Sequence, residues 1–334
     1  MKRELGEYNL AVVLNDNAKR VTPQVRARIH ELVPERSIFY SRSLDDSSAI
    51  ARKVVDARYD AVFTGGGDGT VIQFINDMVA THAPLPALGV LPLGTGNALA
   101  SMVSSGDYLH DLETYVLQKQ ADFQHIGLLQ SEGRVFPFAG LGIDARILND
   151  YVHIKKRYAE NRVMKPLLQG LGGYLLASFG RTIPQVVGDA MAGRRTSVRV
   201  VNRGRLAFRA DVEGSPVEEF GPGQVIYQGE AHMVSAATAP YYGHGMKIFP
   251  NSLRHPGYFE LRIVFGSIAR AVAKLGTVWK GRFVEDGFWS VMAEDVSVEF
   301  DRDMPFQIGG DAHGLRKNVQ FTLSPTRLRL LRFI

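Results

Sequence analysis

The chain has 334 residues, of which 45% are hydrophobic and 22% charged, and this composition is typical of a globular protein with room for two domains. It has no cysteine, which excludes disulfides, thiol nucleophiles and thiolate metal sites and fits a cytoplasmic location. No run reaches the roughly 18 uncharged apolar residues of a membrane-spanning helix, and we expect no secretion signal in the charged first residues. The net charge of +5 indicates an anionic partner.

The first third of the chain alternates between short apolar runs and amphipathic segments. Apolar runs predict buried strands, and segments that begin with a capping residue or an acidic pair predict helices. We expect strands at 8–14, 37–40, 60–64 and 86–91, and helices at 22–33, 44–59, 70–82 and 107–119. Repeated strand–helix units form a parallel sheet covered by helices on both faces, so residues 1–120 are predicted to be a Rossmann-like α/β domain.

After Gln120 the pattern changes to strand-like segments that are rich in β-branched and aromatic residues. They lie at 121–131, 134–139, 196–202, 205–212, 224–237, 257–266, 288–301 and 317–323. This pattern predicts a mainly antiparallel β-sandwich domain over residues 121–334. We expect a helical, basic insertion at 143–180, and we expect the C-terminal end to pack back on the first domain.

A glycine-rich turn follows the strand predicted at 60–64. Gly66, Gly67 and Gly69 allow a sharp turn and let backbone N–H groups approach a ligand closely. Thr70 is expected to cap the next helix, whose N-terminus favours anions. The loop therefore predicts a phosphate site that also carries an acid, Asp68. A plain tight turn without a ligand would contain the same glycines.

A second loop of the same kind follows the next apolar run. It reads Gly94-Thr95-Gly96-Asn97, and Asn97 would either cap the following helix or offer a donor and an acceptor to a nucleotide. Ligands of open α/β sheets bind at the carboxyl ends of the strands. Two such loops on consecutive strands therefore favour a binding site over a pair of plain turns.

The segments 66–70 (Gly-Gly-Asp-Gly-Thr) and 92–97 (Pro-Leu-Gly-Thr-Gly-Asn) resemble the catalytic domain of diacylglycerol kinases and of their sphingosine and ceramide kinase relatives. NAD kinases share only the first of these motifs. Three later segments are also similar to the family. They are 138–145 (Phe-Ala-Gly-Leu-Gly-Ile-Asp-Ala), 245–250 (Gly-Met-Lys-Ile-Phe-Pro) and 305–311 (Pro-Phe-Gln-Ile-Gly-Gly-Asp). The resemblance therefore runs in order through nearly the whole chain.

The resemblance implies a phosphotransferase with an alcohol acceptor, which would be a lipid kinase that uses ATP and Mg²⁺. Its substrate would be a hydroxyl of a diacylglycerol-like or sphingoid lipid. Residues 1–120 would be the nucleotide-binding catalytic domain and residues 121–334 the lipid-binding domain. The nucleotide-binding residues would be Asn15, Gly66, Gly67, Gly69, Thr70, Gly94, Thr95, Gly96 and Asn97.

Three aspartates carry the chemistry that the resemblance implies. Asp68 cannot bind phosphate directly, because two anions repel, so we expect it to act through Mg²⁺ or on a proton of the acceptor, and we favour a shared role near the metal. Asp311 is the expected general base, and Asp144 is expected to hold the hydroxyl of the lipid or to join the acidic cluster.

The chain departs from the family pattern in its last acidic motif, in the loop after its first strand and at His255-Pro256-Gly257, where we expect the structural Mg²⁺ site of bacterial diacylglycerol kinases to be absent. Gly309 stands where the family has Asp, and Asp311 stands where it has Glu. The loop after the first strand keeps Asn15 but lacks the proline and glycine of the family. These departures leave open a catalytically impaired nucleotide- or lipid-binding protein of the same fold. A kinase of a soluble acceptor such as NAD is a further alternative, which the Gly-Thr-Gly-Asn loop disfavours.

Basic residues outnumber acidic ones between residues 146 and 181. The basic residues are Arg146, Lys155, Lys156, Arg157, Arg162, Lys165 and Arg181. A solvated helix face would explain them, and so would a docking surface for anionic lipid headgroups that associates peripherally with a membrane. We expect no nucleic acid partner, because the basic residues are not interleaved with an aromatic platform. The sequence leaves the oligomeric state open, a homodimer included.

Overall fold

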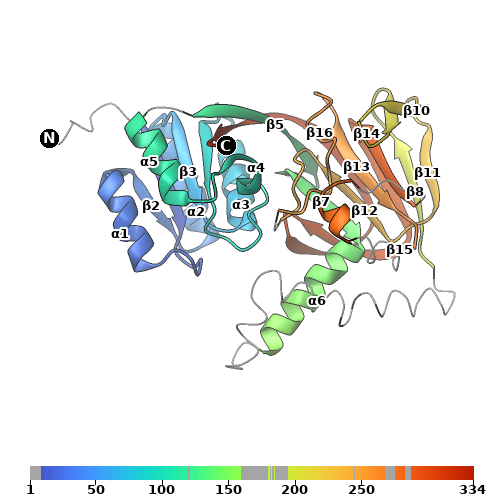
Figure 1. Ribbon diagram of the computed structural model, residues 1–334, viewed down its shortest axis with the longest axis horizontal. Helices are drawn as coiled ribbons and strands as arrows, with labels where there is room; N and C mark the ends of the chain where they lie inside the picture. The colour runs from blue at the N-terminus through green and yellow to red at the C-terminus, as the bar shows by residue number, and fades with distance from the viewer. Residues whose placement is uncertain are drawn as a thin grey trace. The chain divides into compact units, whose positions relative to one another are not determined.

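A computed structural model describes residues 9–118, 121–158, 195–243, 245–267, 275–282 and 287–334, with the isolated residues 180, 182 and 184. Figure 1 shows the elements in chain order. The chain forms two compact units. The first comprises Met1–Gly127, Gly243–Gly245 and Pro325–Ile334, and the second comprises Leu128–Tyr242 and Met246–Ser324.

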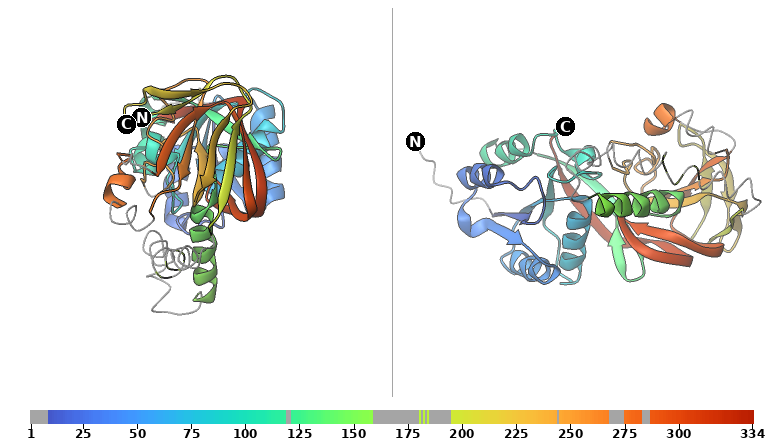
Figure 2. Two further views of the ribbon diagram at one scale, coloured as in Figure 1. Left: turned by 90° about the vertical axis from the view of Figure 1, so that its right-hand side faces the viewer. Right: turned by 90° about the horizontal axis from the view of Figure 1, so that it is seen from below.

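The first unit contains a parallel sheet in the order β2-β1-β3-β4. Its strands are β1 (Leu10–Asn15), β2 (Ile38–Ser41), β3 (Ala61–Gly65) and β4 (Ala87–Leu91). All residues of β3 and β4 are buried, as expected for strands that are covered on both faces. Helix α1 (Pro23–Leu32) packs on α5 (Tyr108–Gln118), and α2 (Leu44–Asp56) packs on α3 (Asp68–Val79). Figure 2 shows these two pairs on opposite faces of the sheet, which confirms the predicted α/β fold.

Local signals in the sequence explain where the first helices begin. The hydroxyl of Thr22 accepts a hydrogen bond from the backbone N–H of Val25, and Pro23 occupies the first turn of α1. Ser43 caps α2 in the same way through the N–H of Asp46. Two short helices, η1 (Glu35–Ser37) and α4 (Ala100–Val103), complete the helices of this unit among the described residues.

The C-terminal end of the chain belongs to the first unit. Strand β16 (Asp311–Arg332) reaches this unit at its end, where Leu330 pairs in parallel with Leu88 of β4. The N–H of Phe333 donates to the carbonyl of Val103 at 2.7 Å. The ring of Phe333 also lies 6.2 Å from that of Phe63, so the last residues contribute to the core of this unit.

The second unit is an antiparallel β-sandwich, which confirms the fold class predicted for it. One sheet has the order β10-β9-β14-β13-β12-β7-β15, and β15 also pairs with β8 and β16. Residues 296–300 of β15 pair with β8, whereas residues 306–308 pair with β7, so this strand contributes to both sheets. The strands are β5 (Asp122–Ser131), β6 (Arg134–Phe136), β7 (Phe138–Gly142), β8 (Ser197–Asn202), β9 (Ala207–Ala210), β10 (Pro216–Phe220), β11 (Val225–Glu230), β12 (Met233–Ala237), β13 (Phe259–Val264), β14 (Phe288–Ala293) and β15 (Asp295–Ile308).

The strands differ from the prediction in four places. The segment 224–237 forms two strands, β11 and β12, and the segment 288–301 contains β14 and the start of β15. Strand β10 was not predicted, because most of its residues are exposed and two are glutamates. Strand β16 begins at Asp311 instead of 317, because its exposed polar residues hide the alternation by which a half-buried strand is recognised.

The predicted helical insertion begins with α6 (Ile143–Arg157). Most of the rest, residues 159–179, lies outside the described residues. The described part of the second unit has one further helix, α11 (Leu275–Trp279). Among the helices that the structure describes, none combines the length and the hydropathy that crossing a membrane requires.

Candidate functional site

The two glycine-rich loops of the first unit lie against each other. Gly67 is the N-cap of α3, with φ of −87°, and Gly94 follows β4. A Cβ atom on Gly94 would collide with the Cα of Gly67 and would lie 2.7 Å from the carbonyl oxygen of Gly66. Only a residue without a side chain fits there, so the contact explains why Gly94 is a glycine.

Asp68 connects the two loops. It is the first residue of α3, and its Oδ1 accepts a hydrogen bond of 2.7 Å from the backbone N–H of Ala98, beyond the second loop. Its Oδ2 would lie 2.5 Å from a Cβ on Gly96, so this glycine also leaves room for the carboxylate. Charge-assisted bonds of this kind are stronger than neutral ones. Asp68 therefore holds the second loop against the first turn of α3.

The structure corrects the role predicted for Thr70. The helix begins two residues earlier, with Gly67 as N-cap and no side-chain cap, so Thr70 lies inside the first turn. Its hydroxyl accepts a hydrogen bond of 2.8 Å from the side-chain amide of Asn15 at the end of β1. The Oδ1 of Asn15 accepts from the N–H of Asn17 at 2.9 Å. Asn15 and Thr70 thus link β1 to α3 at the same sheet edge.

The structure also corrects the capping role considered for Asn97. The N-cap of α4 is Leu99, and Asn97 has a φ of +52°. Its side chain closes the loop on itself, because Oδ1 accepts from the N–H of Gly94 and Nδ2 donates to the carbonyl of Gly94, both at 3.0 Å. Thr95, between them, is exposed.

These loops form an edge that suits an anion. The N-terminus of α3 presents backbone N–H groups of its first turn, including that of Gly69, and the partial positive charge of the helix dipole. Among the described residues, no group of three His, Cys, Asp or Glu side chains could hold a metal ion by itself. Mg²⁺ is commonly held by one or two carboxylates together with the phosphates of a substrate, and the single carboxylate of Asp68 fits that pattern.

Asp144, at the start of α6, is buried in the second unit with 6% exposure. Its Oδ2 accepts hydrogen bonds from the hydroxyl of Tyr242 and, at 3.0 Å, from that of Ser235. Burial raises the pKa of Asp144, whereas these bonds lower it. Neither Tyr242 nor Ser235 was predicted from the sequence. The Gly-Ile-Asp-Ala segment pointed to Asp144, but its partners follow only from the pairing of β7 with β12.

Asp311 is an exposed residue that directly follows the turn between β15 and β16. Partial withdrawal from water raises the pKa of its carboxyl group, whereas the charges of His313 and Arg134 lower it. Burial in turn lowers the pKa of His313. An exposed carboxylate whose pKa is raised suits the acceptance of a proton.

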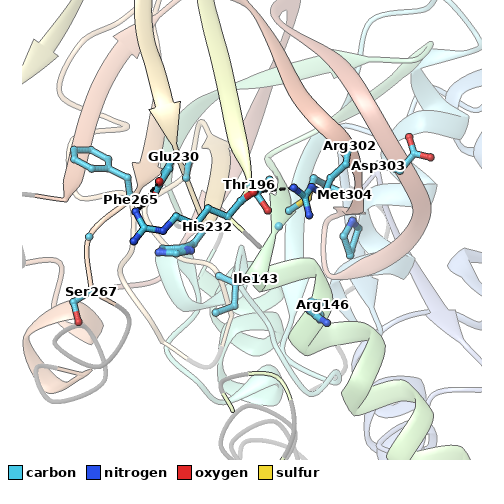
Figure 3. A pocket seen from close by; sticks show the side chains of 15 residues that line it. Ile143, Arg146, Thr196, Glu230, His232, Phe265, Ser267, Arg302, Asp303 and Met304 are labelled. Atoms are coloured by element: carbon cyan, nitrogen blue, oxygen red, sulfur yellow. Dashed lines mark hydrogen bonds and ion pairs between the residues drawn. The ribbon is translucent and has the colours of Figure 1, made fainter. Parts of the chain in front are cut away.

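A cavity of about 500 Å³ lies in the second unit, and Figure 3 shows its lining. Its wall combines arginines with apolar side chains such as Phe265. The guanidinium group of Arg195 is paired with Glu230 at 2.8 Å, and that of Arg302 with Asp301 at 3.1 Å. Two of its cations are therefore already neutralised by carboxylates.

The basic segment predicted at 146–181 is described only in part. Arg146 lines the cavity, and the guanidinium group of Arg157 lies 6.0 Å from the ring centroid of Tyr158. The side chains of Lys155 and Lys156, and the residues Arg162, Lys165 and Arg181, lie outside the described part of the structure.

Replacing Gly94 by alanine should weaken the nucleotide binding that the sequence predicts for these loops, because the new methyl group would push two backbone segments apart. A displacement of about 1 Å can cost about 100-fold in a reaction rate, so we expect kcat/KM for ATP to fall by about that factor. Gly276→Ala is the matched control, because a Cβ at Gly276 would meet no atom within 4 Å. Equal ATP affinity for Gly94→Ala and the unaltered protein, measured by calorimetry, would contradict this view of the loops.

An α/β unit with two paired glycine-rich loops, followed by an antiparallel β-sandwich, is the fold of diacylglycerol kinases. Residues 9–127 match the model of the diacylglycerol kinase catalytic domain. Residues 192–332 match the model of the YegS C-terminal NAD kinase β-sandwich-like domain. Residues 9–127 therefore belong to the diacylglycerol kinase catalytic-domain family, and residues 192–332 to the family of YegS-type C-terminal domains.

Individual relatives agree with this assignment. Proteins named diacylglycerol kinase from Staphylococcus epidermidis (strain RP62A) and Staphylococcus aureus (strain JH9) are 32% and 30% identical to the chain over 79 residues. The match covers 24% of this chain and spans a quarter (25%) of the length of each relative. The crystal structure of a diacylglycerol kinase from Bacillus anthracis str. Sterne has a TM-score of 0.64 at 14% identity, over 97% of this chain and 96% of that one. At this identity the likeness supports the fold alone.

Proposed function

We propose that the protein transfers the γ-phosphoryl group of ATP to a hydroxyl group of a diacylglycerol-like or sphingoid lipid. The observation that carries the proposal is the junction of two glycine-rich loops through Asp68 at the carboxyl ends of β3 and β4. It gives one sheet edge a helix N-terminus for phosphate and a carboxylate for a cation. Family membership supports the lipid as acceptor.

On the donor side, the two loops would bind the phosphates of ATP. The glycines permit close approach of the backbone, and the N–H groups at the start of α3 would bind phosphate oxygens. Asp68 would hold Mg²⁺ together with those oxygens. When bound, Mg²⁺ would neutralise charge that develops on the transferred group. Asn97 and Asn15 would act mainly by keeping the loops in shape, since their amide groups are engaged within the protein.

On the acceptor side, Asp311 would act as the general base. As the hydroxyl oxygen of the lipid attacks the γ-phosphorus, its proton would pass to the carboxylate of Asp311, the bond from phosphorus to the bridging oxygen would break, and ADP would leave. Such proton transfer contributes about 10²–10⁴-fold to a rate. The exposure of Asp311 is compatible with access by an acceptor, and its raised pKa favours proton uptake.

The proposal includes peripheral association with an anionic membrane surface from the cytoplasm, because the acceptor is a lipid and the chain carries a net charge of +5. Binding to vesicles with and without anionic lipid tests this part. The fraction bound should rise with anionic lipid and fall with salt.

The test of the proposed function is incubation of the purified protein with labelled ATP, Mg²⁺ and a mixed lipid extract. Mass spectrometry should then identify a phosphorylated lipid whose formation requires Mg²⁺. ATP binding without transfer to any lipid would instead support a catalytically impaired binding protein, the alternative that the glycine at position 309 leaves open. Transfer to NAD in place of a lipid would support a kinase of a soluble acceptor.

A further inference from the structure

The position of Asp311 depends on a two-residue turn. Ile308 pairs with Asp311, and Gly309 and Gly310 between them have φ of 59° and 85°. Two central residues with positive φ define a type I′ hairpin turn, which favours glycine. Asp311 is the first residue after the turn, so the orientation of the turn fixes where its carboxylate lies.

The side chain of Gln307 holds this turn from inside the sheet. Gln307 is 2% exposed, and its Oε1 accepts a hydrogen bond of 2.8 Å from the N–H of Gly310. Its Nε2 donates to the hydroxyl of Tyr242 and lies 3.5 Å from the Oδ2 of Asp144. Both ends of the amide therefore have partners.

The partners of Gln307 also decide which way its amide faces. The hydroxyl of Tyr242 donates its hydrogen to Asp144, so toward Gln307 it can only accept. Only the NH₂ end of the amide can meet an acceptor there, and the oxygen must then face Gly310. The turn is thus connected to a buried acid through a chain of oriented hydrogen bonds.

Strand register brings these groups together. Gln307 of β15 pairs with Gly140 of β7, and Gly140 pairs with Ser235 of β12. A Cβ on Gly140 would collide with the carboxylate of Asp144 and with the hydroxyl of Ser235. Asp144 therefore lies over a position that has no side chain, between the two neighbouring strands.

We propose that Gln307 is a positioning residue, which Tyr242 and Asp144 orient and which fixes the Gly310 turn so that the carboxylate of Asp311 is held in place. The inference rests on the proposed function, in which Asp311 accepts the proton of the lipid hydroxyl. It also gives Asp144 a role in supporting the turn instead of contacting the substrate.

A second contact makes the effect of Gln307 specific. The N–H of Gly309 donates to the carbonyl of Phe138 at 3.0 Å, so β7 anchors the first residue of the turn independently of Gln307. Loss of the glutamine amide should therefore release Gly310 while the hairpin stays paired.

The test compares Gln307→Met, which keeps the size but removes both hydrogen bonds, with Gln307→Glu. A protonated glutamic acid reproduces the pattern, because one oxygen accepts from Gly310 and the other donates to Tyr242. Burial next to Asp144 favours that protonated form. Gln320→Leu is the matched control, because Gln320 donates to Asp295 on the same hairpin, away from the turn.

We expect Gln307→Met to accelerate hydrogen exchange at the Gly310 amide and to lower kcat for labelled ATP and the lipid extract about 10- to 100-fold, with KM for ATP unchanged. Gln307→Glu should recover most of kcat, and Gln320→Leu should change neither quantity. Hydrogen exchange can be measured without any enzymatic activity, so it tests the bond from Gly310 to Gln307 even if the unaltered protein transfers no phosphate. Absence of transfer by the unaltered protein would reject the proposed function but not this bond. Unchanged exchange at Gly310, or full kcat in an active Gln307→Met variant, would overturn the positioning role.

Discussion

Replacing Asp68 by alanine should lower phosphate transfer about 10²–10³-fold and weaken ATP binding at least about tenfold, because one carboxylate serves two purposes. Its Oδ1 accepts the N–H of Ala98 and so holds the second loop against α3. A hydrogen bond to a charged group contributes about 1.5–3 kcal/mol, and about 1.4 kcal/mol corresponds to a factor of ten in affinity. Loss of the proposed Mg²⁺ contact adds to the effect on the rate.

Asp68→Asn separates the two purposes. The amide oxygen of asparagine can still accept from Ala98, so ATP affinity should stay near that of the unaltered protein. The lost charge should keep phosphate transfer slow and raise the Mg²⁺ concentration that transfer requires. Full activity of Asp68→Asn would exclude a role of the Asp68 charge in holding Mg²⁺ and would leave only its bond to the second loop. Unchanged ATP affinity in Asp68→Ala would instead exclude a role of that bond in ATP binding.

Asp77→Asn is the control on the same helix. Its carboxylate accepts hydrogen bonds from Ser47, Ser48 and Gln73 at 2.6, 2.9 and 2.9 Å, away from the loops. The variant should lower the free energy of unfolding without a change in transfer. Calorimetric ATP binding and thermal unfolding, measured on all three variants, distinguish a damaged helix from a damaged site.

The sequence predicted the first unit well because its signals are local. Thr22 and Pro23 mark the start of α1 within a few residues, and the glycines after β3 and β4 mark the turns. Parallel neighbouring strands end at one edge, so the approach of the two loops follows from strand order alone. The bond from Asp68 to Ala98, 30 residues apart, is a consequence of that order.

The hydrogen bonds within each loop were not predictable in the same way. Thr70 is a common capping residue, yet Gly67 takes the cap position and leaves the hydroxyl of Thr70 to Asn15. Asn97 adopts a left-handed conformation and bonds to Gly94 instead of to the next helix. Local propensity describes which groups can bond but does not choose between neighbouring partners.

The environment of Asp144 was beyond sequence reasoning for a different reason. Gln307 lies 163 residues from Asp144 in the chain, and Tyr242 lies 98 residues away. Gln307 lies on β15, which pairs with β7, and Tyr242 lies in the segment that follows β12, which pairs with β7 on the other side. A shift of one residue in either pairing would turn the side chains to the other face, and no local pattern fixes that register.

The turn before Asp311 also explains one departure from the family pattern. Type I′ turns accept Asp-Gly and Gly-Gly alike, because both central positions need positive φ. Gly309 and Gly310 therefore preserve the hairpin although the acid that the family has at the first position is lost. The Gly309-Gly310 turn therefore lacks a carboxylate at its first position but still places Asp311 directly after the turn.

Replacing Asp311 by asparagine should lower kcat about 10²–10⁴-fold, with KM for ATP unchanged, because the amide keeps the shape of the side chain but cannot accept a proton. The residue is exposed, so the free energy of unfolding should stay the same. Asp295→Asn is the control on the same hairpin, since the carboxylate of Asp295 contacts only Gln320 among the hydrogen bonds described for it. Full activity of Asp311→Asn would exclude this residue as the base.

The pH dependence gives a second, independent measure of the same role. A base acts in its deprotonated form, so kcat/KM should fall as the pH drops through the pKa of Asp311. Partial withdrawal from water raises that pKa, which places the acidic limb at a higher pH than an ordinary aspartate would. Arg134 lowers the pKa of Asp311, so Arg134→Gln should move the limb to still higher pH. The residual kcat/KM of Asp311→Asn should not fall over this pH range. If it still fell, the titrating group would be another residue.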